Sequence, residues 1–337
     1  MFFQHVVLKL KRGESKISAK NKIGQKTRIG IVLSSGGARG VYAHTGFVQA
    51  LQEMNINISA VSGCSAGAIV GGVLASGKNM KSWASALLAL KSRQFWRPSW
   101  FHLIWSLLVK RWAGYTGLSS MDAAMGFCAS QLKVQTYEEC AIPFSALAIN
   151  IGTGEKTLFD SGELAPSMVA SAAIPMIYQP VEINGQFYCD GALVDLAPTD
   201  AICCKHNLDI LIIHHVAQTY EDASGLKEML KRPWTLLEIL NRYIFRQQPW
   251  YYSDKHLTFR RCPCGCDAIV IIINPDLPEL QWPMTNSGLQ VLQAAQKQTV
   301  RYIEPWLESV KYNARSLNEN IQELPSGEAQ THKHTCN

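Results

Sequence analysis

Short apolar runs alternate with helical stretches along most of the chain. We expect strands where the apolar runs are unbroken, and helices where apolar residues recur every three or four positions. The expected strands are 28–34, 58–62, 143–150, 155–159, 208–214 and 268–273, and the expected helices are 41–54, 65–75 and a longer helical stretch over 80–112. This alternation predicts one α/β domain whose central sheet is sandwiched by helices.

Both ends of the chain depart from this pattern. Residues 1–27 form a basic arm, in which the lysines and arginines from Lys9 to Lys26 are accompanied by a single acidic residue, Glu14. The arm is expected to be a solvated tail, or else a contact for anionic lipid head groups or a partner. Residues 313–337 are polar and predict a C-terminal tail with a helical start. The folded domain is therefore expected over 28–312.

The composition is that of a folded protein. Hydrophobic residues make up 47% of the 337 residues and charged residues only 17%, against roughly 25% charged in a typical soluble domain. This excludes a disordered or fibrous chain. The formal net charge of +6 is too small for a dedicated nucleic-acid binder, so no nucleic-acid partner is expected. An attraction to an anionic membrane surface stays open.

Cysteine usage and the N-terminal sequence indicate a cellular location. The ten cysteines are too sparse for a disulfide scaffold and are expected to be reduced thiols. The apolar run from Phe2 to Leu8 is short, and its charges follow it, which is not the pattern of a signal peptide. No stretch reaches the ~18 uncharged apolar residues that a membrane-spanning helix needs. We therefore expect a cytoplasmic protein, with peripheral membrane association as an option.

The strongest local signal is Gly63-Cys64-Ser65-Ala66-Gly67, a G-x-S-x-G sequence between an expected strand and an expected helix. A serine at such a sharp turn is presented to substrate, and the helix N-terminus directs backbone N–H groups towards developing negative charge. The alternative is a small-residue turn that only packs the helix close to the sheet. The position directly after a strand favours Ser65 as a nucleophile.

A second glycine-rich segment, Ser35-Gly36-Gly37-Ala38-Arg39-Gly40, follows the first expected strand. Consecutive glycines let backbone N–H groups converge on an anion. A P-loop is excluded, because Val41 and Tyr42 stand where Lys and Ser or Thr are required. A dinucleotide site is disfavoured, because Ser35 replaces the first glycine and no acidic residue stands about 20 residues downstream. An oxyanion hole beside a separate nucleophile fits best, and a plain tight turn is the alternative.

The third motif is Asp190-Gly191-Ala192, which follows an expected aromatic strand after the turn at Asn184-Gly185. A carboxylate at a strand end, beside a glycine, has the chemistry of a general base. Taken singly, however, Asp-Gly is most often only a turn. The significance of Asp190 comes from the two motifs that precede it.

In this order and spacing, the three motifs resemble those of the patatin-like phospholipases, especially the bacterial branch. The resemblance extends from about Arg28 to about Tyr312 and includes the stretches 150–155 and 170–175. It implies an α/β three-layer sandwich with a central, mostly parallel sheet flanked by helices. It also implies a lipid acyl hydrolase of the phospholipase A or lysophospholipase type, which cleaves carboxylic esters of phospholipids or other acyl-ester lipids through an acyl-serine intermediate.

The same resemblance implies a site built on a Ser–Asp dyad without histidine, and no metal or cofactor. Its implied members are the catalytic residues Ser65 and Asp190, an oxyanion hole at Gly36, Gly37 and Ala38, and the loop-bracing residues Arg39 and Gly40. Two positions depart from the family pattern. Ser35 stands where members often have a third glycine, and Ala192 where many have glycine, but neither change removes a reacting group. His44, behind the loop, is expected to make a structural hydrogen bond.

Two alternatives to this function stay open. Ser65 and Asp190, followed by one of the histidines His206, His214 or His215, have the chain order of an α/β-hydrolase triad. That fold, however, builds more strands before its serine than are found here, and His214 and His215 end a buried strand. The second alternative is a non-catalytic protein that binds a membrane or a partner on the same scaffold. The sequence does not identify a protein partner.

Two aromatic-rich segments lie among basic residues. In the first, Phe101, Trp105, Leu108 and Trp112 share one helical face, at spacings of four, three and four. This segment is either a helix packed on the core or an interfacial lid, since tryptophan and basic residues together suit the head-group boundary. The second segment, from Trp234 to Tyr252, would be a further surface of the same kind.

Three cysteines alternate in Cys262-Pro263-Cys264-Gly265-Cys266, with His256 upstream. The spacing is poor for zinc, because structural sites use C-x₂₋₄-C pairs with a second distant pair, and C-x-C-x-C strains a single tetrahedral centre. A turn between two strands is therefore favoured, and metal binding and redox sensitivity are the alternatives.

Overall fold

The structure is a computed structural model, and it describes residues 27–109, 111, 115–216, 251, 255–262, 264–281 and 284–322. The expected basic arm, apart from Thr27, lies outside these residues. So does the second aromatic segment, from Trp234 to Tyr252, apart from Tyr251. Tyr251 is fully buried, so this residue belongs to the core and not to a membrane-facing surface.

Every expected strand is present, with ends that shift by one or two residues. The described elements are β1 (Ile29–Leu33), α1 (Gly37–Glu53), β2 (Ile58–Cys64), α2 (Ala66–Ala75), α3 (Met80–Leu88), η1 (Ser92–Gln94), α4 (Trp100–Leu108), β3 (Gly117–Ser119), α5 (Asp122–Gln131), β4 (Phe144–Asn150), β5 (Lys156–Phe159), α6 (Leu164–Ala170), β6 (Met176–Tyr178), β7 (Val181–Ile183), β8 (Gln186–Asp190), η2 (Gly191–Leu193), β9 (Ile210–His214), β10 (Leu257–Arg261), β11 (Ile269–Ile273), α9 (Met284–Ile303), η4 (Glu304–Trp306), α10 (Leu307–Tyr312) and η5 (Ala314–Asn320). The confirmed strands show that unbroken apolar runs were a reliable signal in this chain.

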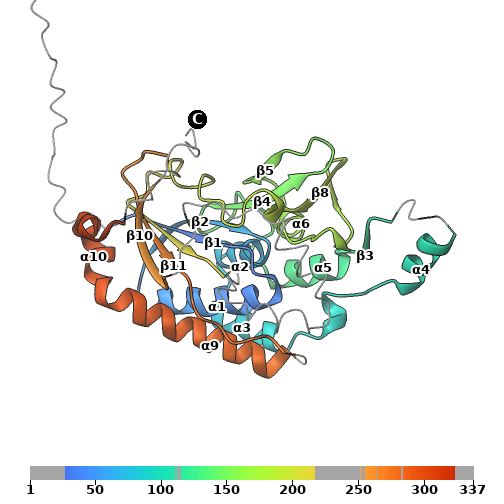
Figure 1. The fold of residues 1–337 in the computed structure, drawn as a ribbon, viewed down its shortest axis with the longest axis horizontal. Helices are drawn as coiled ribbons and strands as arrows, with labels where there is room; N and C mark the ends of the chain where they lie inside the picture. Colours follow the sequence, from blue (N-terminus) through green and yellow to red (C-terminus); the bar gives the residue numbers. More distant parts are fainter. Residues whose placement is uncertain are drawn as a thin grey trace, which may run out of the picture.

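The central sheet has the order β10-β11-β9-β1-β2-β4-β8-β7, and β5 pairs with β4 off this path (Figure 1). Its middle strands, β11, β9, β1, β2 and β4, are parallel to one another. The strands that border them, β10 on one side and β5, β8 and β7 on the other, pair antiparallel. The expected α/β fold is confirmed, with a mixed sheet whose centre is parallel. Parallel strands bring the ends of β1 and β2 to one edge, where ligands of α/β folds bind.

Residues of the central strands alternate between two buried cores. Ile31 and Ile212 lie in the core that contains Phe47 of α1, whereas Val32 and Ile213 lie in the core on the opposite face. Helices α1 and α9 cover the first face, and α9 runs along α1 below the sheet in Figure 1. In the described residues the second face is covered by η2 and the turns of 194–207. Burial on both faces explains why these strands are apolar throughout.

The expected helical stretch over 80–112 is interrupted. It contains α3, the single turn η1 and α4, and Pro98 forms an isolated bridge with Ser119 between η1 and α4. Proline lacks the backbone N–H that a helix interior requires and disfavours helical geometry in the residue before it. The apolar periodicity of this stretch therefore does not correspond to a continuous helix.

Helix α4 stands away from the rest of the protein (Figure 1). The exposed fraction is 78% for Phe101, 46% for Trp105 and 73% for Leu108. The interpretation of this segment as a helix packed on the core is therefore wrong. None of the described helices combines the length and the apolar character that crossing a bilayer requires.

The folded domain continues beyond Tyr312, where we expected a tail to begin. Leu317 in η5 is fully buried, Ile321 forms a bridge with Phe259 of β10, and the Gln322 N–H donates a hydrogen bond of 2.8 Å to the Phe259 carbonyl. The polar composition of this segment predicted a tail, although it contains one buried leucine and a residue that pairs with β10. Residues 323–337 lie outside the described part.

Helices α1 and α9 are in close contact at Gly46. A Cβ atom at this position would lie 2.1 Å from the carbonyl oxygen of Leu292 in α9, which is far inside van der Waals contact. Gly46 is therefore required for this helix pair, whose contact closes the core on the first face of the sheet.

We predict that Gly46→Ala lowers the free energy of unfolding by about 2 kcal/mol or more, because α9 must move away from α1 to admit the methyl group. Gly126→Ala in α5 is the matched control, since its Cβ would meet no atom within 4 Å. The control is expected to gain ~0.5–1 kcal/mol from helix propensity. Urea denaturation followed by circular dichroism measures both changes, and equal stabilities for the two variants would contradict the packing argument.

Candidate active site

Ser65 occupies a strained turn between β2 and α2. Its φ and ψ angles are 54° and −118°, in a region that residues with a side chain rarely adopt. The glycines on either side allow this turn. A Cβ at Gly63 would lie 2.4 Å from the Gly67 carbonyl oxygen, and one at Gly67 would lie 2.0 Å from that of Leu33. The G-x-S-x-G sequence therefore has the strand–turn–helix setting in which such a serine is a nucleophile.

A second serine, Ser171, holds this turn in place. The Ser65 backbone N–H donates to the Ser171 hydroxyl oxygen at 2.9 Å, and that hydroxyl donates to the Leu147 carbonyl of β4 at 2.5 Å. Ser171 is fully buried. The stretch 170–175 formed part of the family resemblance, but its sequence pattern gave no role to Ser171, whose partners lie on two distant strands.

Asp190 lies at the end of β8 and is fully buried. Its Oδ1 atom accepts a hydrogen bond of 2.9 Å from the Ala192 N–H and a weaker one of 3.8 Å from the Cys64 thiol. Its Oδ2 atom has no hydrogen-bond partner in the described part of the chain. One carboxylate oxygen is thus fixed, and the other is open to accept a proton.

The structure brings Ser65 and Asp190 together. Burial raises the pKa of Asp190 to about 7, while hydrogen bonding by the Ala192 N–H, the Ser65 hydroxyl and the Cys64 thiol acts to lower it. The Ser65 hydroxyl is thus near enough to interact with the carboxyl group, although no aligned hydrogen bond joins it to Oδ2. Catalytic hydrogen bonds are often long in the absence of substrate.

The expected glycine loop is largely the first turn of α1. The helix begins at Gly37, four residues before the expected start, and the Gly40 N–H closes its first turn on the Gly36 carbonyl at 2.8 Å. The first N–H groups of a helix have no partner within it, so those of Gly37 and Ala38 are free of intrahelical bonds. Gly40 also lies against α2, since a Cβ there would be 2.9 Å from that of Ala66. The positive ends of two helices therefore meet beside Ser65.

Hydrogen bonds anchor the segment before α1. The Arg39 guanidinium donates to the Val216 carbonyl at 3.3 Å, and the Ser35 N–H donates to the Leu196 carbonyl at 2.8 Å. The Val216 N–H in turn donates to the Ser34 hydroxyl at 2.9 Å. These contacts hold the start of α1 against the segments that contain Leu196 and Val216.

Buried histidines lie behind the site and interact with each other. The His44 Nε2 atom is 2.7 Å from the Ser34 carbonyl oxygen, and its Nδ1 atom is 2.8 Å from Nδ1 of His214. Burial lowers the pKa of His44 to about 3 and that of His215 to about 4, so both rings are neutral near pH 7. Among the described residues no histidine is hydrogen-bonded to Ser65 or Asp190. The geometry therefore gives no support to a Ser–Asp–His triad.

An apolar cavity of about 180 Å³ opens at Ser65. Gly37 and Ala38 also line it. Its walls are almost entirely hydrophobic side chains, among them those of Val41, Ile69, Leu87, Leu90, Phe95, Phe127 and Ile174. A chain of methylene groups is the kind of ligand that such walls accommodate.

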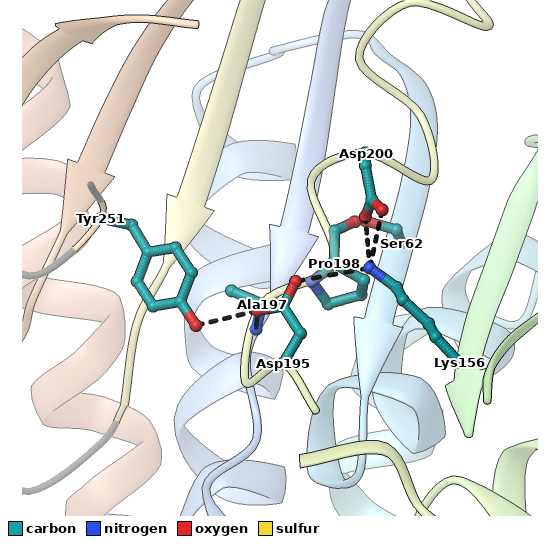
Figure 2. A network of polar contacts seen from close by, with 7 residues as sticks. All are labelled: Ser62, Lys156, Asp195, Ala197, Pro198, Asp200 and Tyr251. Atoms are coloured by element: carbon teal, nitrogen blue, oxygen red, sulfur yellow. Dashed lines mark hydrogen bonds and ion pairs between the residues drawn. The ribbon is translucent and has the colours of Figure 1, made fainter. Parts of the chain in front are cut away.

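A polar network anchors the segment that follows Asp190 (Figure 2). Lys156 of β5 lies 3.5 Å from the buried Asp195 carboxylate and 2.7 Å from that of Asp200. Asp195 also accepts a hydrogen bond of 2.9 Å from the Tyr251 hydroxyl. Burial raises the pKa of Asp195, and the nearby Lys156 lowers it. Sequence reasoning missed this network, because these residues come from three separate parts of the chain.

Comparison with known proteins identifies the family. The sequence model described as patatin-like phospholipase matches residues 31–202, which is more than half of the chain and includes both Ser65 and Asp190. The chain belongs to the patatin-like phospholipase family. An uncharacterized NTE family protein of Mycobacterium tuberculosis is 31% identical over 173 residues, or 51% of this chain and 44% of that protein.

One further relative and two solved structures are also similar to this chain. The lysophospholipase NTE1 of Cryptococcus neoformans is 28% identical over 197 residues, 58% of this chain and 11% of that protein. The matched region thus spans less than half of these curated relatives. Human GIVD cytosolic phospholipase A2 has a TM-score of 0.49 at 9% identity, over 84% of this chain and 62% of that chain. VipD from Legionella pneumophila has a TM-score of 0.40 at 15% identity, over 90% of this chain and 73% of that chain.

We predict that Ser171→Ala destabilises the patatin-like domain. The substitution leaves the buried Ser65 N–H and Leu147 carbonyl without their shared partner, at a cost of about 1–3 kcal/mol. Ser130→Ala is the matched control, because Ser130 is exposed and its loss is expected to change stability by no more than about 0.5 kcal/mol. Denaturant titration of both variants tests the assignment, and a Ser171→Ala protein as stable as the control would count against it.

Proposed function

We propose that this protein hydrolyses carboxylic ester bonds in lipids at Ser65, with Asp190 as the general base. One observation carries the proposal: a serine in a strained turn, which lines an apolar cavity, interacts with a buried carboxyl group whose Oδ2 atom is open. Membership of a family of phospholipases supports the same reaction class.

In the proposed acylation step, Asp190 Oδ2 takes the Ser65 hydroxyl proton as Oγ attacks the ester carbonyl carbon. The carbonyl oxygen gains negative charge, which the N–H groups at Gly36, Gly37 and Ala38 stabilise at the N-terminus of α1. The bond to the alcohol then breaks, and the leaving oxygen receives the proton from Asp190. A water molecule, deprotonated by the same carboxylate, cleaves the acyl-Ser65 ester and regenerates both groups.

A dyad without histidine is chemically sufficient here, because burial has already moved the carboxyl group towards the basicity of imidazole. With a pKa of about 7, Asp190 is a far better base than an exposed aspartate and is still ionised in half or more of the molecules at neutral pH. Each oxyanion donor contributes a further 2.7–4 kcal/mol or so to the transition state. Arg39 and Gly40 contribute by bracing the donors: Arg39 through Val216, and Gly40 through its contact with α2. No step of this mechanism calls for a metal or a cofactor.

The proposed substrate is a lipid with a long acyl chain, of the phospholipase A or lysophospholipase type. The cavity walls offer the acyl chain mostly apolar contacts, and Ser65, Gly37 and Ala38 line the same cavity. This distribution positions the ester carbonyl at the serine once the chain fills the cavity.

Helix α4 is the proposed contact with the membrane that holds this substrate. Its exposed face is formed by aromatic and aliphatic side chains, at Trp100, Phe101, Ile104, Trp105, Leu108 and Val109. Exposed basic residues precede it, at Lys91, Arg93 and Arg97. An apolar face with nearby positive charge binds the interface of an anionic bilayer. Phe95, between those residues, lines the cavity, so the membrane contact leads to the acyl site. A peripheral protein of the cytoplasm remains our prediction for its location.

The dyad can be tested with Ser65→Ala and Asp190→Asn on a fluorogenic acyl ester. Each variant is expected to lose at least about 10³-fold in kcat/KM, because each removes a group that acts only in the transition state. The wild-type rate is expected to rise with pH and to level off above a midpoint near pH 7, since Asp190 must be ionised. A fluorophosphonate should label Ser65 in the wild type.

His206→Ala is the control for this experiment, because His206 is half-buried and was the most accessible candidate for a triad. It is expected to keep the wild-type rate within about threefold. Asp190→Asn should also unfold at a higher denaturant concentration than wild type at pH 8, since it removes a buried charge. A histidine variant that abolishes turnover, or an active Asp190→Asn, would refute the dyad. A wild type that is neither labelled nor active would favour the non-catalytic alternative.

The membrane contact can be tested with a variant that carries Phe101→Ser, Trp105→Ser and Leu108→Ser together. We predict more than tenfold weaker binding to phosphatidylglycerol-containing vesicles, because each side chain contributes up to about 1.5–3 kcal/mol when it is fully buried in an apolar phase. Turnover of a soluble short-chain ester should stay within about twofold of wild type. A matched control carries Leu289→Ser and Tyr312→Ser, two exposed apolar positions on other helices. Unchanged vesicle affinity of the α4 variant would refute this role.

A further inference from the structure

Four thiols from two distant segments converge beside the second face of the sheet. Cys262, Cys264 and Cys266 belong to the loop between β10 and β11, as the expected turn between two strands requires. Cys203 lies in the turns of 194–207 that cover this face. All four are free cysteines. Their convergence has no part in the proposed hydrolysis, because none of them lines the cavity at Ser65.

The sulfur atoms are separated by distances that suit a shared cation. Sγ of Cys264 lies 3.2 Å from that of Cys262 and 3.9 Å from that of Cys203. The three sulfurs of the loop all lie within 4.8 Å of one another, and the sulfurs of Cys203 and Cys264 form a second such group with that of Cys204. Four sulfurs at 2.3 Å from a zinc ion would be about 3.8 Å apart. A disulfide would require about 2.0 Å.

The local backbone allows alternate cysteines to face one centre. Gly265 has a φ of +83°, and its N–H donates to the Cys262 carbonyl at 3.1 Å, so the loop turns back sharply between its second and third cysteine. The Cys266 N–H points at the Cys264 sulfur, 3.4 Å away. Backbone N–H groups that donate to sulfur stabilise its thiolate form. The left-handed residue thus relieves the strain that C-x-C-x-C imposes on a single tetrahedral centre.

We propose that Cys203, Cys262, Cys264 and Cys266 bind one zinc ion in a tetrahedral four-sulfur site. Binding converts four thiols to thiolates and releases four protons, with no change of oxidation state. Four cysteine ligands with no open position are typical of a structural zinc site. Cys204 is excluded from the ligand set, although its Sγ lies 3.2 Å from that of Cys264, because it is disulfide-bonded, contrary to the expectation that all the cysteines are reduced. His256 is excluded because it lies at the other end of β10 from the loop.

The proposed site would fasten the cover of the second face to the edge of the sheet. Cys203 follows Asp195 and Asp200 on the segment that begins directly after Asp190. The Lys156 network holds the first part of this segment, and the metal would hold its end against the β10–β11 loop. We therefore assign the ion a structural role, at a distance from the reacting atoms.

Elemental analysis of the full chain tests this proposal directly. The protein is expressed with zinc in the medium and purified with a reductant and without chelators, and one zinc ion per chain is expected. Cys203→Ser and Cys264→Ser should each lose most of this zinc. Cys140→Ser is the matched control, because Cys140 is a free, half-buried cysteine outside the cluster, and it should keep the full equivalent.

Cobalt substitution keeps the test decisive if the serine variants fail to fold. Wild-type protein stripped of zinc and loaded with Co²⁺ should show the intense visible bands of tetrahedral cobalt and the near-ultraviolet charge transfer of cobalt–thiolate bonds, and its melting temperature should recover when Zn²⁺ is returned. Wild-type protein that holds no zinc and gives no such spectrum would overturn the proposal. The proposal would also be overturned by disulfides among the four cysteines in protein purified with the reductant, or by variants that keep their zinc.

Discussion

The buried carboxyl group of Asp190 is the constraint on which the rest of this structure depends. Burial raises its pKa from 3.8 to about 7, so between these pH values the folded protein holds a proton that the unfolded chain has lost. Its contribution to stability is complete below about pH 4 and is lost as the pH rises through 7. At a pH where the carboxylate is ionised and could act as the proposed base, its buried charge therefore lowers the free energy of unfolding. The same desolvation is responsible for both effects.

Contacts around the site stabilise the segments that carry Asp190 and Ser65. Within the described part of the chain Asp190 forms no ion pair, and its Oδ1 atom accepts from the Ala192 N–H and the Cys64 thiol. Lys156 pairs instead with Asp195 and Asp200. These ion pairs anchor the segment that follows Asp190. The serine turn is held in the same indirect way, by Ser171 through a backbone N–H. Neighbouring residues hold both groups, while Oγ and Oδ2, the atoms that react in the proposed mechanism, stay available.

The sequence predicted those features that are local. Unbroken apolar runs located the strands, and the paired glycines around Ser65 located the turn, because only glycine fits at Gly63 and Gly67. The start of α1 was placed too late, since Gly37 and Gly40 are poor helix formers and the fold overrides that preference. The roles of Ser171 and Lys156 were not predictable, because their partners are far away in sequence. The same holds for Cys203, which changes the chemistry of the alternating cysteines and is 61 residues from Cys264.

The exposed face of α4 follows from the buried position of Ser65. Only 2% of Ser65 is exposed, so the proposed lipid substrate would reach it through the cavity and not across the surface. The entrance to such a cavity must accept an acyl chain without first passing it through water, which an apolar surface beside Phe95 provides. In water that surface is unfavourable by about 25 cal/mol for each Å² exposed. In the proposed function a bilayer removes this cost and supplies the substrate at the same time, so the exposed apolar face that is unfavourable in water would direct the protein to its lipid.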